Sequence, residues 1–308
     1  MRIRKSKVIE IIGAPISLGS AGKGASLGPD AIRIAGLQKC LHYLTLEYVD
    51  SGNLPSLEEP YPPKYFPPGE IKYLDEIYDF LALLKDKVYE SFKKDHFPLV
   101  LGGDHSLAIG SLAATAKFYA EQGQKPGLIW FDAHADCNTE ATSLSGNIHG
   151  MPLAVAIGYG NKKLLSLFEG QFFDPLRTVI MGVRSVDPDE AKFLDEVGLQ
   201  VFTMKDIDEI GMMQAIKQAI KKASPKNNPI HLSFDVDGLD TTAAPGTGTP
   251  VMGGITLREA HLLLEMLAET NLLTSMDMVE VNPILDYRNQ TAAIALSLLE
   301  SALGKVIY

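Results

Sequence analysis

Short apolar runs alternate with longer amphipathic stretches along most of this 308-residue chain. Several of the runs are apolar throughout, which is typical of parallel strands that are buried on both faces. The expected strands are 8–12, 99–101, 127–131, 178–181, 200–203, 230–234 and 275–281. The expected helices include 71–92, 106–120, 212–222, 256–270 and 290–303. This alternation predicts an α/β fold in which helices cover both sides of a parallel sheet.

Residues 54–69 interrupt the alternation with six prolines and three aromatic residues. Because proline disfavours both helix and sheet, we expect a loop or connector here. The chain before this segment supplies one strand and one helix, which is too little for an independent core. We therefore expect one domain that spans residues 1–308.

The glycine-rich stretch 19–28 could suggest a phosphate-binding loop. It matches neither G-x-x-x-x-G-K-[ST] nor G-x-G-x-x-G in the right setting. A loop that leads into a helix with Pro29 at its first position fits better, because proline is favoured there.

The composition is that of a globular protein and narrows the classes of function. Hydrophobic residues make up 46% of the chain, and its formal net charge is −10. These values argue against a disordered chain and against a nucleic-acid binder with a basic surface. The sequence has no apolar run of about 18 residues and no signal-peptide core, and Cys40 and Cys137 cannot make a disulfide framework. We expect a cytoplasmic protein whose partners include neither a membrane nor a nucleic acid.

Acids and histidines gather in four short segments at or near the ends of expected strands. The segments are Gly102-Gly-Asp-His-Ser106, Asp132-Ala-His-Ala-Asp136, Asp235-Val-Asp237 and Asp277-Met-Val-Glu280. In an open parallel sheet, ligands bind outside the carboxyl ends of the strands, so the four segments would meet at one edge. Residues i and i+2 of an extended chain point the same way, which lets Asp132, His134 and Asp136 converge.

Carboxylates gathered in this way repel one another unless cations compensate their charge. Two divalent ions would balance four carboxylates, and mixed carboxylate and imidazole ligands suit Mn²⁺ or a similar first-row ion. A water between two such ions ~3.5–4 Å apart can ionise near neutral pH and attack an electrophile. The sequence therefore predicts a dinuclear metal site.

Each segment alone has a simpler interpretation as a turn, a cap or a surface histidine. The combination of all four favours the metal site. A two-metal phosphoesterase could use the same carboxylates, but no basic cluster that would clamp a phosphate accompanies them. The histidines outside these segments are expected to have structural or surface roles, namely His42, His96, His231 and His261.

Seven stretches of the sequence resemble the ureohydrolase family, which comprises the arginases and agmatinases. In family order they are GGDHS (102–106), DAHAD (132–136), SGNIHGMP (145–152), SFDVDGLD (233–240), PGTGTP (245–250), GGITLRE (253–259) and EVNP (280–283). The resemblance covers nearly the whole chain. It implies a three-layer α/β/α sandwich with a mostly parallel central sheet of roughly eight strands.

The resemblance also implies two Mn²⁺ ions, for which Co²⁺ or Ni²⁺ could substitute. One ion would be held by His105, Asp132, Asp136 and Asp235, and the other by Asp132, His134, Asp235 and Asp237. Asp132 and Asp235 would bridge the two ions. Asp136 would also accept a proton and pass it on, and His149 would be the proton shuttle. Glu280 would lie under the substrate guanidinium, with Thr249 in the same pocket.

Two further segments resemble those with which arginases hold the amino-acid end of their substrate. Asn138, Ser145 and Asn147 match the positions that meet the α-carboxylate. Asp187 and Glu190 match the acids that meet the α-ammonium, although acids near the first turn also stabilise a helix. Because agmatine lacks the carboxylate, we expect L-arginine as the substrate and L-ornithine and urea as the products.

Four residues depart from those usual in the motifs and bear on metal affinity, namely Ala135, Cys137, Met151 and Thr241. We expect Cys137 to pack behind the site as a small apolar group. An agmatinase or another guanidino hydrolase is the main alternative. A scaffold without catalysis would lack ligands, whereas every expected ligand is present. The resemblance further suggests a homo-oligomer, either a trimer or a hexamer.

Overall fold

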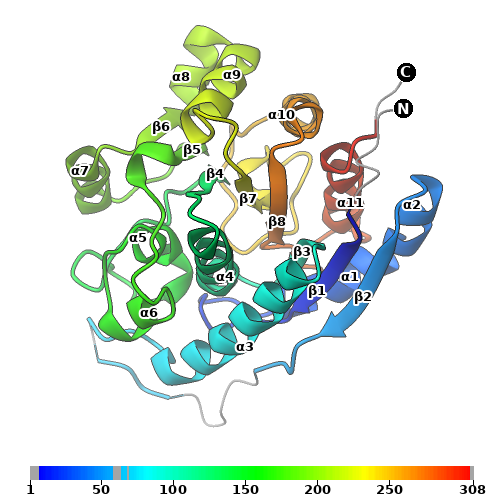
Figure 1. The fold of residues 1–308 in the computed structure, drawn as a ribbon. Helices are drawn as coiled ribbons and strands as arrows, with labels where there is room; N and C mark the ends of the chain where they lie inside the picture. Colours follow the sequence, from blue (N-terminus) through cyan, green and yellow to red (C-terminus); the bar gives the residue numbers. More distant parts are fainter. Residues whose placement is uncertain (1–6, 58–63, 68, 306–308) are drawn as a thin grey trace.

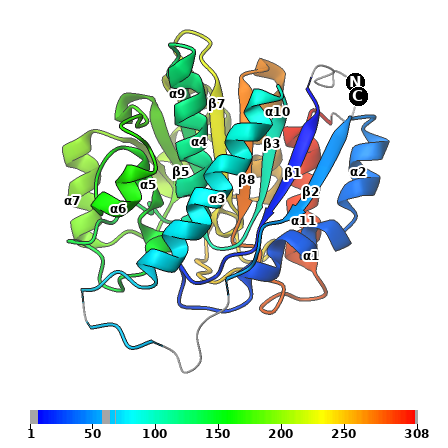
Figure 2. The same ribbon diagram turned by 60° about the horizontal axis from the view of Figure 1, so that its bottom comes forward.

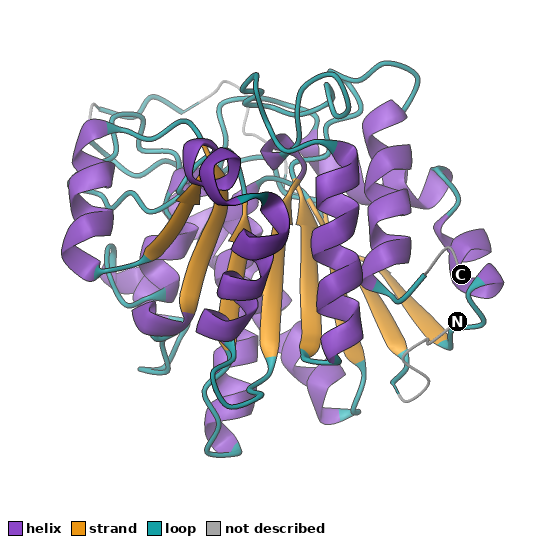
Figure 3. Ribbon diagram, turned by 90° about the horizontal axis from the view of Figure 1, so that it is seen from above, coloured by secondary structure: helices purple, strands orange, loops and turns teal. Residues whose placement is uncertain are grey.

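The computed structural model describes residues 7–57, 64–67 and 69–305. They form an eight-stranded sheet in the order β2-β1-β3-β8-β7-β4-β5-β6, and every pairing is parallel. The strands are β1 (Ile9–Ala14), β2 (Tyr48–Asn53), β3 (Phe97–Gly102), β4 (Gly127–Phe131), β5 (Thr178–Val183), β6 (Gln200–Thr203), β7 (Ile230–Asp235) and β8 (Leu273–Val279). Figure 3 shows the sheet as the middle layer between two layers of helices, so the expected three-layer α/β/α fold is confirmed.

Successive side chains of the central strands enter two different cores. Phe131 of β4 packs into one core and its neighbour Trp130 into the other. The first core lies under α1 (Gly28–Ile34), α2 (Leu37–Tyr43), α8 (Met204–Ile210), α9 (Met212–Ala223), α10 (Leu257–Thr270) and α11 (Gln290–Ala302). The second lies under α3 (Leu74–Lys93), α4 (Ala108–Glu121), α5 (Pro152–Ala156), α6 (Lys162–Ser166) and α7 (Pro188–Val197). Figures 1 and 2 show these two layers from different sides.

The longest helix, α3, follows directly from its sequence. Ile77, Leu81, Leu84 and Val88 recur at spacings of three or four residues, and all four are buried against the sheet. The acids in its first turn and Lys93 in its last turn match the helix dipole. The expected helices 71–92, 106–120, 212–222, 256–270 and 290–303 all occur, with ends that differ by a few residues.

The structure corrects the expected strands at two places. The edge strand β2 was not expected, because its sequence YVDSGN is polar and half exposed and carries no continuous apolar run. Strand β8 ends at Val279, two residues earlier than the expected 275–281, so that Glu280 follows the strand instead of lying on it.

The two irregular segments of the sequence contain no long element. In the described part of 54–69, no residue belongs to a helix or strand, as expected, while 58–63 and 68 lie outside the described residues. The stretch 19–28 forms a loop and the short 3-10 helix η1 (Ala25–Leu27). It leads into α1, which begins at Gly28, one residue before the expected Pro29. None of the helices within residues 7–57, 64–67 and 69–305 combines the length and the hydropathy that a membrane span requires.

Candidate metal centre and substrate pocket

The expected metal ligands lie at the carboxyl ends of β3, β7 and β4, and Glu280 follows β8, which lies between β3 and β7 in the sheet. The chain passes from β3 to β4 across the two places that β8 and β7 later fill, and ligands collect where strand order changes in this way. His105 begins the 3-10 helix η2 (His105–Leu107) just after β3. Asp235 is the last residue of β7, and Asp237 lies in the 3-10 helix η5 (Val236–Gly238).

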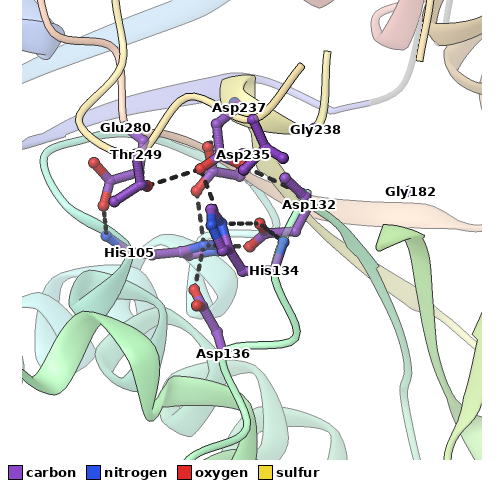
Figure 4. A network of polar contacts seen from close by, with 12 residues as sticks. His105, Asp132, His134, Asp136, Gly182, Asp235, Asp237, Gly238, Thr249 and Glu280 are labelled. Atoms are coloured by element: carbon purple, nitrogen blue, oxygen red, sulfur yellow. Dashed lines mark hydrogen bonds and ion pairs between the residues drawn. The ribbon is translucent and has the colours of Figure 1, made fainter. Parts of the chain in front are cut away.

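His105 is surrounded by carboxylates. Its Nδ1 atom lies 3.1 Å from Asp132 Oδ2, 3.0 Å from Asp136 Oδ2 and 3.1 Å from Asp235 Oδ2. Figure 4 shows these side chains pointing toward one another. Despite the short distances, His105 Nδ1 is fully buried and has no hydrogen-bond partner among the described residues. One imidazole nitrogen and three carboxylate oxygens that converge on a common point are arranged as if around a cation.

The other side of the His105 ring is held firmly. Its Nε2 atom lies 2.9 Å from the hydroxyl of Ser233, and the ring stacks on Trp130 at a centroid distance of 3.9 Å. Trp130 also donates from its indole nitrogen to Asp132 Oδ2 at 3.0 Å. Partners of this kind fix the orientation and tautomer of a metal-binding histidine.

A second group of candidate ligands consists of Asp132, His134 and Asp237. His134 Nδ1 lies 3.1 Å from Asp237 Oδ2 and 3.4 Å from Asp132 Oδ1. Asp132 belongs to both this group and the group of His105, Asp132 and Asp136. Asp235 Oδ2 approaches His105, while Asp235 Oδ1 accepts a hydrogen bond from the Asp237 N–H at 2.8 Å. Thus all six expected metal ligands lie together.

Burial and mutual charge dominate the electrostatics of this cluster. Burial raises the pKa of Asp237 to about 6, with a further increase from the charge of Asp132. Burial likewise raises the pKa of Asp235 well above its usual range. The pKa of His134 is raised to about 12, because hydrogen bonds to Asp132 and Asp237 outweigh burial, which acts to lower it. Ionised carboxylates in this buried cluster are therefore unfavourable unless positive charge compensates them, and divalent ions would do so.

Backbone conformation at two acids is unusual. Asp136 has φ +48° and Glu280 has φ +62°, in the left-handed region that non-glycine residues seldom adopt. Residues held in this way cost of order 1–3 kcal/mol each and cluster at functional sites. Glu280 Oε1 accepts a hydrogen bond from the His105 N–H at 2.9 Å, and His149 Nδ1 lies 3.6 Å from the same oxygen. Burial acts to lower the pKa of His149, but the neighbouring carboxylate of Glu280 outweighs it and raises the pKa to about 9.

Two acids of the expected segments have structural partners instead. Asp104, which precedes His105, accepts hydrogen bonds from the N–H groups of Gly19 and Ser106 and caps η2. Asp277 lies inside β8, where its Oδ2 accepts from Ser111 and lies 3.1 Å from His231 Nε2. The fourth segment therefore contributes only Glu280 to the edge of the sheet, and His231 has the structural role that was expected.

A cavity of about 320 Å³ opens above the metal ligands. Its lining is formed by His134, Asp136, Asn138, Ser143, Leu144, Ser145, His149, Gly150, Ser185, Asp187, Glu190, Asp235, Asp237, Thr249 and Glu280. His105 and Asp132 lie buried below it. Ser143, Leu144, Gly150 and Ser185 were not singled out in the sequence, although all four belong to or adjoin the segments that were.

The expected substrate contacts lie around this cavity, with one exception. Asn147 does not line it, and its side-chain oxygen accepts a hydrogen bond from Lys72 Nζ at 3.0 Å. Asn138 donates to Asp187 Oδ2 at 3.3 Å, and its own buried oxygen has no partner in the described chain. Thr249 donates to Asp237 Oδ2 at 3.0 Å, so it supports a candidate ligand as well as lining the cavity.

Glu190 combines a helix cap with a place in the cavity. It closes a capping box with Asp187 at the start of α7, and its Oε1 accepts from the Cys137 N–H at 2.7 Å. Burial raises the pKa of Glu190 to about 7. Cys137 itself is fully buried in the second core, as expected, and burial raises the pKa of its thiol.

Comparison with known proteins by family, by sequence and by structure finds arginases each time. The family described as "Arginase family" matches residues 7–304. The arginase of Bacillus subtilis (strain 168) is 46% identical over 301 residues, which cover 97% of this chain and 98% of that protein. The crystal structure of the arginase from Bacillus caldovelox superimposes with a TM-score of 0.93 at 42% identity, covering 98% of this chain and all of that one. That of Entamoeba histolytica arginase in complex with L-ornithine gives 0.87 at 30% identity over the same shares.

Proposed function

The chain belongs to the arginase family, and on that premise we propose that it hydrolyses the guanidino group of L-arginine to L-ornithine and urea. One observation carries the proposal beyond the family. The same cavity has the candidate metal ligands at its base and neutral amide and hydroxyl groups together with two acids at its mouth. A molecule with a guanidinium at one end and an amino-acid zwitterion at the other fits both ends.

We propose that the centre holds two Mn²⁺ ions, in line with the orphaned His105 Nδ1 and the mixed carboxylate and imidazole donors. One ion would be held by His105, Asp132, Asp136 and Asp235, and the other by Asp132, His134, Asp235 and Asp237. Bound there, the ions would make hydroxide available at neutral pH. Co²⁺ and Ni²⁺ suit the same donors.

The other residues at the bottom of the cavity would bind the guanidinium and transfer protons. A guanidinium carbon is a poor electrophile, because resonance spreads the positive charge, so it must be held close to the nucleophile. The buried carboxylate of Glu280 would pair with the guanidinium, with Thr249 beside it. Asp136 would take the proton of the nucleophile and give it to the departing amine. His149, which lines the cavity and lies 3.6 Å from Glu280 Oε1, would exchange protons with solvent.

At the mouth of the cavity, Asn138 and Ser145 would donate hydrogen bonds to the α-carboxylate, and Asp187 and Glu190 would meet the α-ammonium. Asn147 would act indirectly, from behind the residues that line the cavity, because its side-chain oxygen accepts a hydrogen bond from Lys72. The charge of Lys72 near this subsite favours a substrate that carries a carboxylate. Agmatine has the same guanidinium and ammonium but no carboxylate, so it would lose these contacts.

The test is a kinetic comparison of arginine, agmatine and guanidinobutyrate, with urea as the measured product. The protein is first stripped of metal and then reloaded with Mn²⁺, Co²⁺ or Ni²⁺ in turn. We expect arginine to have the highest kcat/KM with every ion that supports activity. A higher value for agmatine would make the protein an agmatinase, and two bound ions without any urea would favour a scaffold.

We further propose a cytoplasmic homo-oligomer, a trimer or hexamer, without a nucleic-acid or membrane partner. Light scattering coupled to size-exclusion chromatography would measure the mass of the assembly in solution. A monomer of 33.5 kDa at micromolar concentration would contradict the proposal.

A further inference from the structure

Arg184 follows β5 directly, and the hydrogen bonds of its side chain all end on main-chain carbonyl groups. All three guanidinium nitrogens donate, over distances of 2.7 to 3.2 Å. The acceptors are the carbonyl oxygens of Gly182, Asp237, Gly238, Leu239 and Val251. A planar guanidinium can bind several carbonyls at fixed angles, whereas an ammonium cannot. Arg184 therefore fixes the path of the loop that carries Asp237.

The main chain at Arg184 is hydrogen-bonded to a second segment, the one that carries Asp132 and His134. The N–H groups of Arg184 and Ser185 both donate to the carbonyl of Ala133, at 2.9 and 3.1 Å. Ala133 lies between Asp132 and His134 and donates its own N–H to Asp237 Oδ1 at 3.2 Å. One residue thus connects the two chain segments that supply Asp132, His134 and Asp237.

The glycine at position 254 leaves room for this guanidinium. A Cβ atom at Gly254 would lie 2.5 Å from Arg184 Nη2 and 2.6 Å from the carbonyl of Leu239. A side chain at position 254 would therefore push the guanidinium away from the carbonyls that it binds. The charge also matters, because the carboxylates of Asp237 and Asp132 favour the charged form of Arg184 against its partial burial.

The bonds of Arg184 reach one of the two candidate metal groups on both of its chain segments, and the other group only through the shared Asp132. They end on Ala133 and on the loop around Asp237, which belong to the group of Asp132, His134 and Asp237. His105 and Asp136 are held by other partners, namely Ser233 and the main chain of Leu153. A change at Arg184 should therefore disturb the two halves of the centre unequally.

We propose that Arg184 is a positioning residue for one half of the metal centre, which sets the spacing of Asp132 and His134 from Asp237. The proposal rests on the two-metal centre proposed above. It implies that loss of the guanidinium weakens the binding of one ion of the pair while the ion at His105 and Asp136 is retained.

The test counts Mn²⁺ ions bound to the full-length protein, with free Mn²⁺ measured by its electron paramagnetic resonance signal. We expect two tight ions in the parent protein. Arg184→Lys should keep one tight ion and bind the second at least tenfold more weakly, since lysine retains the charge but cannot reach the five carbonyls. Gly254→Ala, whose Cβ would meet both the guanidinium and the Leu239 carbonyl that it binds, should give the same pattern. Arg258→Lys is the matched control, because Arg258 is exposed and, among the residues that the structure describes, its ion pair is with Glu265 on the surface of α10.

Equal weakening of both ions in a folded variant, or no weakening in either variant, would overturn the proposal. So would a parent protein that binds fewer than two ions. Circular dichroism and the melting temperature of the metal-free variants report whether each is folded. Arginine turnover is a separate measurement: two ions without urea production would contradict the proposed function and leave the role of Arg184 standing.

Discussion

Glu190 is placed where stability and substrate binding oppose each other. It is 3% exposed, and burial is the main reason why its pKa rises from 4.5 to about 7, with the charge of Asp136 adding to the rise. Replacement by glutamine removes the charge but keeps an oxygen that can accept the Cys137 N–H. We therefore predict that Glu190→Gln stabilises the folded metal-free protein at alkaline pH and weakens arginine binding.

Proton linkage explains why the substitution should stabilise the protein at alkaline pH. A carboxyl group with a raised pKa in the folded state binds its proton more tightly there than in the unfolded chain. Its contribution to stability is therefore complete below the unfolded value of 4.5 and is lost as the pH rises to about 7. The difference of roughly 2.5 pKa units corresponds to about 3 kcal/mol at about 1.4 kcal/mol per unit. The gain from Glu190→Gln should grow from near zero at acid pH to about 3 kcal/mol above neutrality.

The assay is urea unfolding of parent and variant proteins with a chelator present, at several pH values from 5 to 8. Glu196→Gln is the matched control, because Glu196 is exposed on the same helix α7. With Mn²⁺ bound, the gain should be smaller, because nearby cations favour the ionised carboxylate. A stability difference between parent and Glu190→Gln that does not change with pH would refute the reasoning, since burial of a charge could not be its cause.

Three further substitutions test other parts of the site. Asp235→Ala should abolish both retention of two Mn²⁺ ions and urea production, and a fully loaded, active variant would exclude a bridging role. Lys72→Met should raise the KM for arginine about tenfold and leave agmatine hydrolysis unchanged, because Lys72 binds Asn147 at the carboxylate end; a parallel change for both substrates would assign Lys72 to loop stability instead. Cys137→Ala should retain activity, and mild alkylation should not inactivate the metal-loaded parent, because the thiol is fully buried; inactivation that the variant resists would contradict this.

Much of the sheet could be predicted because its central strands are buried on both faces and so read as continuous apolar runs. Gly127–Phe131 of β4 is an example, with all five residues buried. The edge strand β2 could not be found in the same way. Its polar sequence is half exposed, and it becomes a strand only through its pairing with β1. Tertiary pairing, which a local pattern does not contain, decides such elements.

The site shows the same division between local pattern and tertiary contact. Spacing along the chain was enough to group Asp132, His134 and Asp136, because they follow one strand. Spacing could not show that Asp277 and Glu280 have different roles. Only the folded sheet shows that Asp277 points to His231 within the core. Arg184 left no signal either. Its partners are carbonyl groups, which every residue carries, so no side-chain motif could reveal them.

The cost of the site lies in the same features that equip it for chemistry. Asp136 and Glu280 hold left-handed backbone conformations, and Asp235 is a buried carboxyl with a raised pKa. In the metal-free protein these terms oppose folding and are balanced by the two large apolar cores on either side of the sheet. Binding of cations removes the repulsion but not the backbone strain, because φ at Asp136 and Glu280 is set by the turns after β4 and β8. Substitutions that stabilise the metal-free protein should therefore gather at the acids of this edge. At Asp136 and Glu280 only glycine would relieve the backbone strain. With metal bound, the loss of the Asp136 ligand should offset that gain.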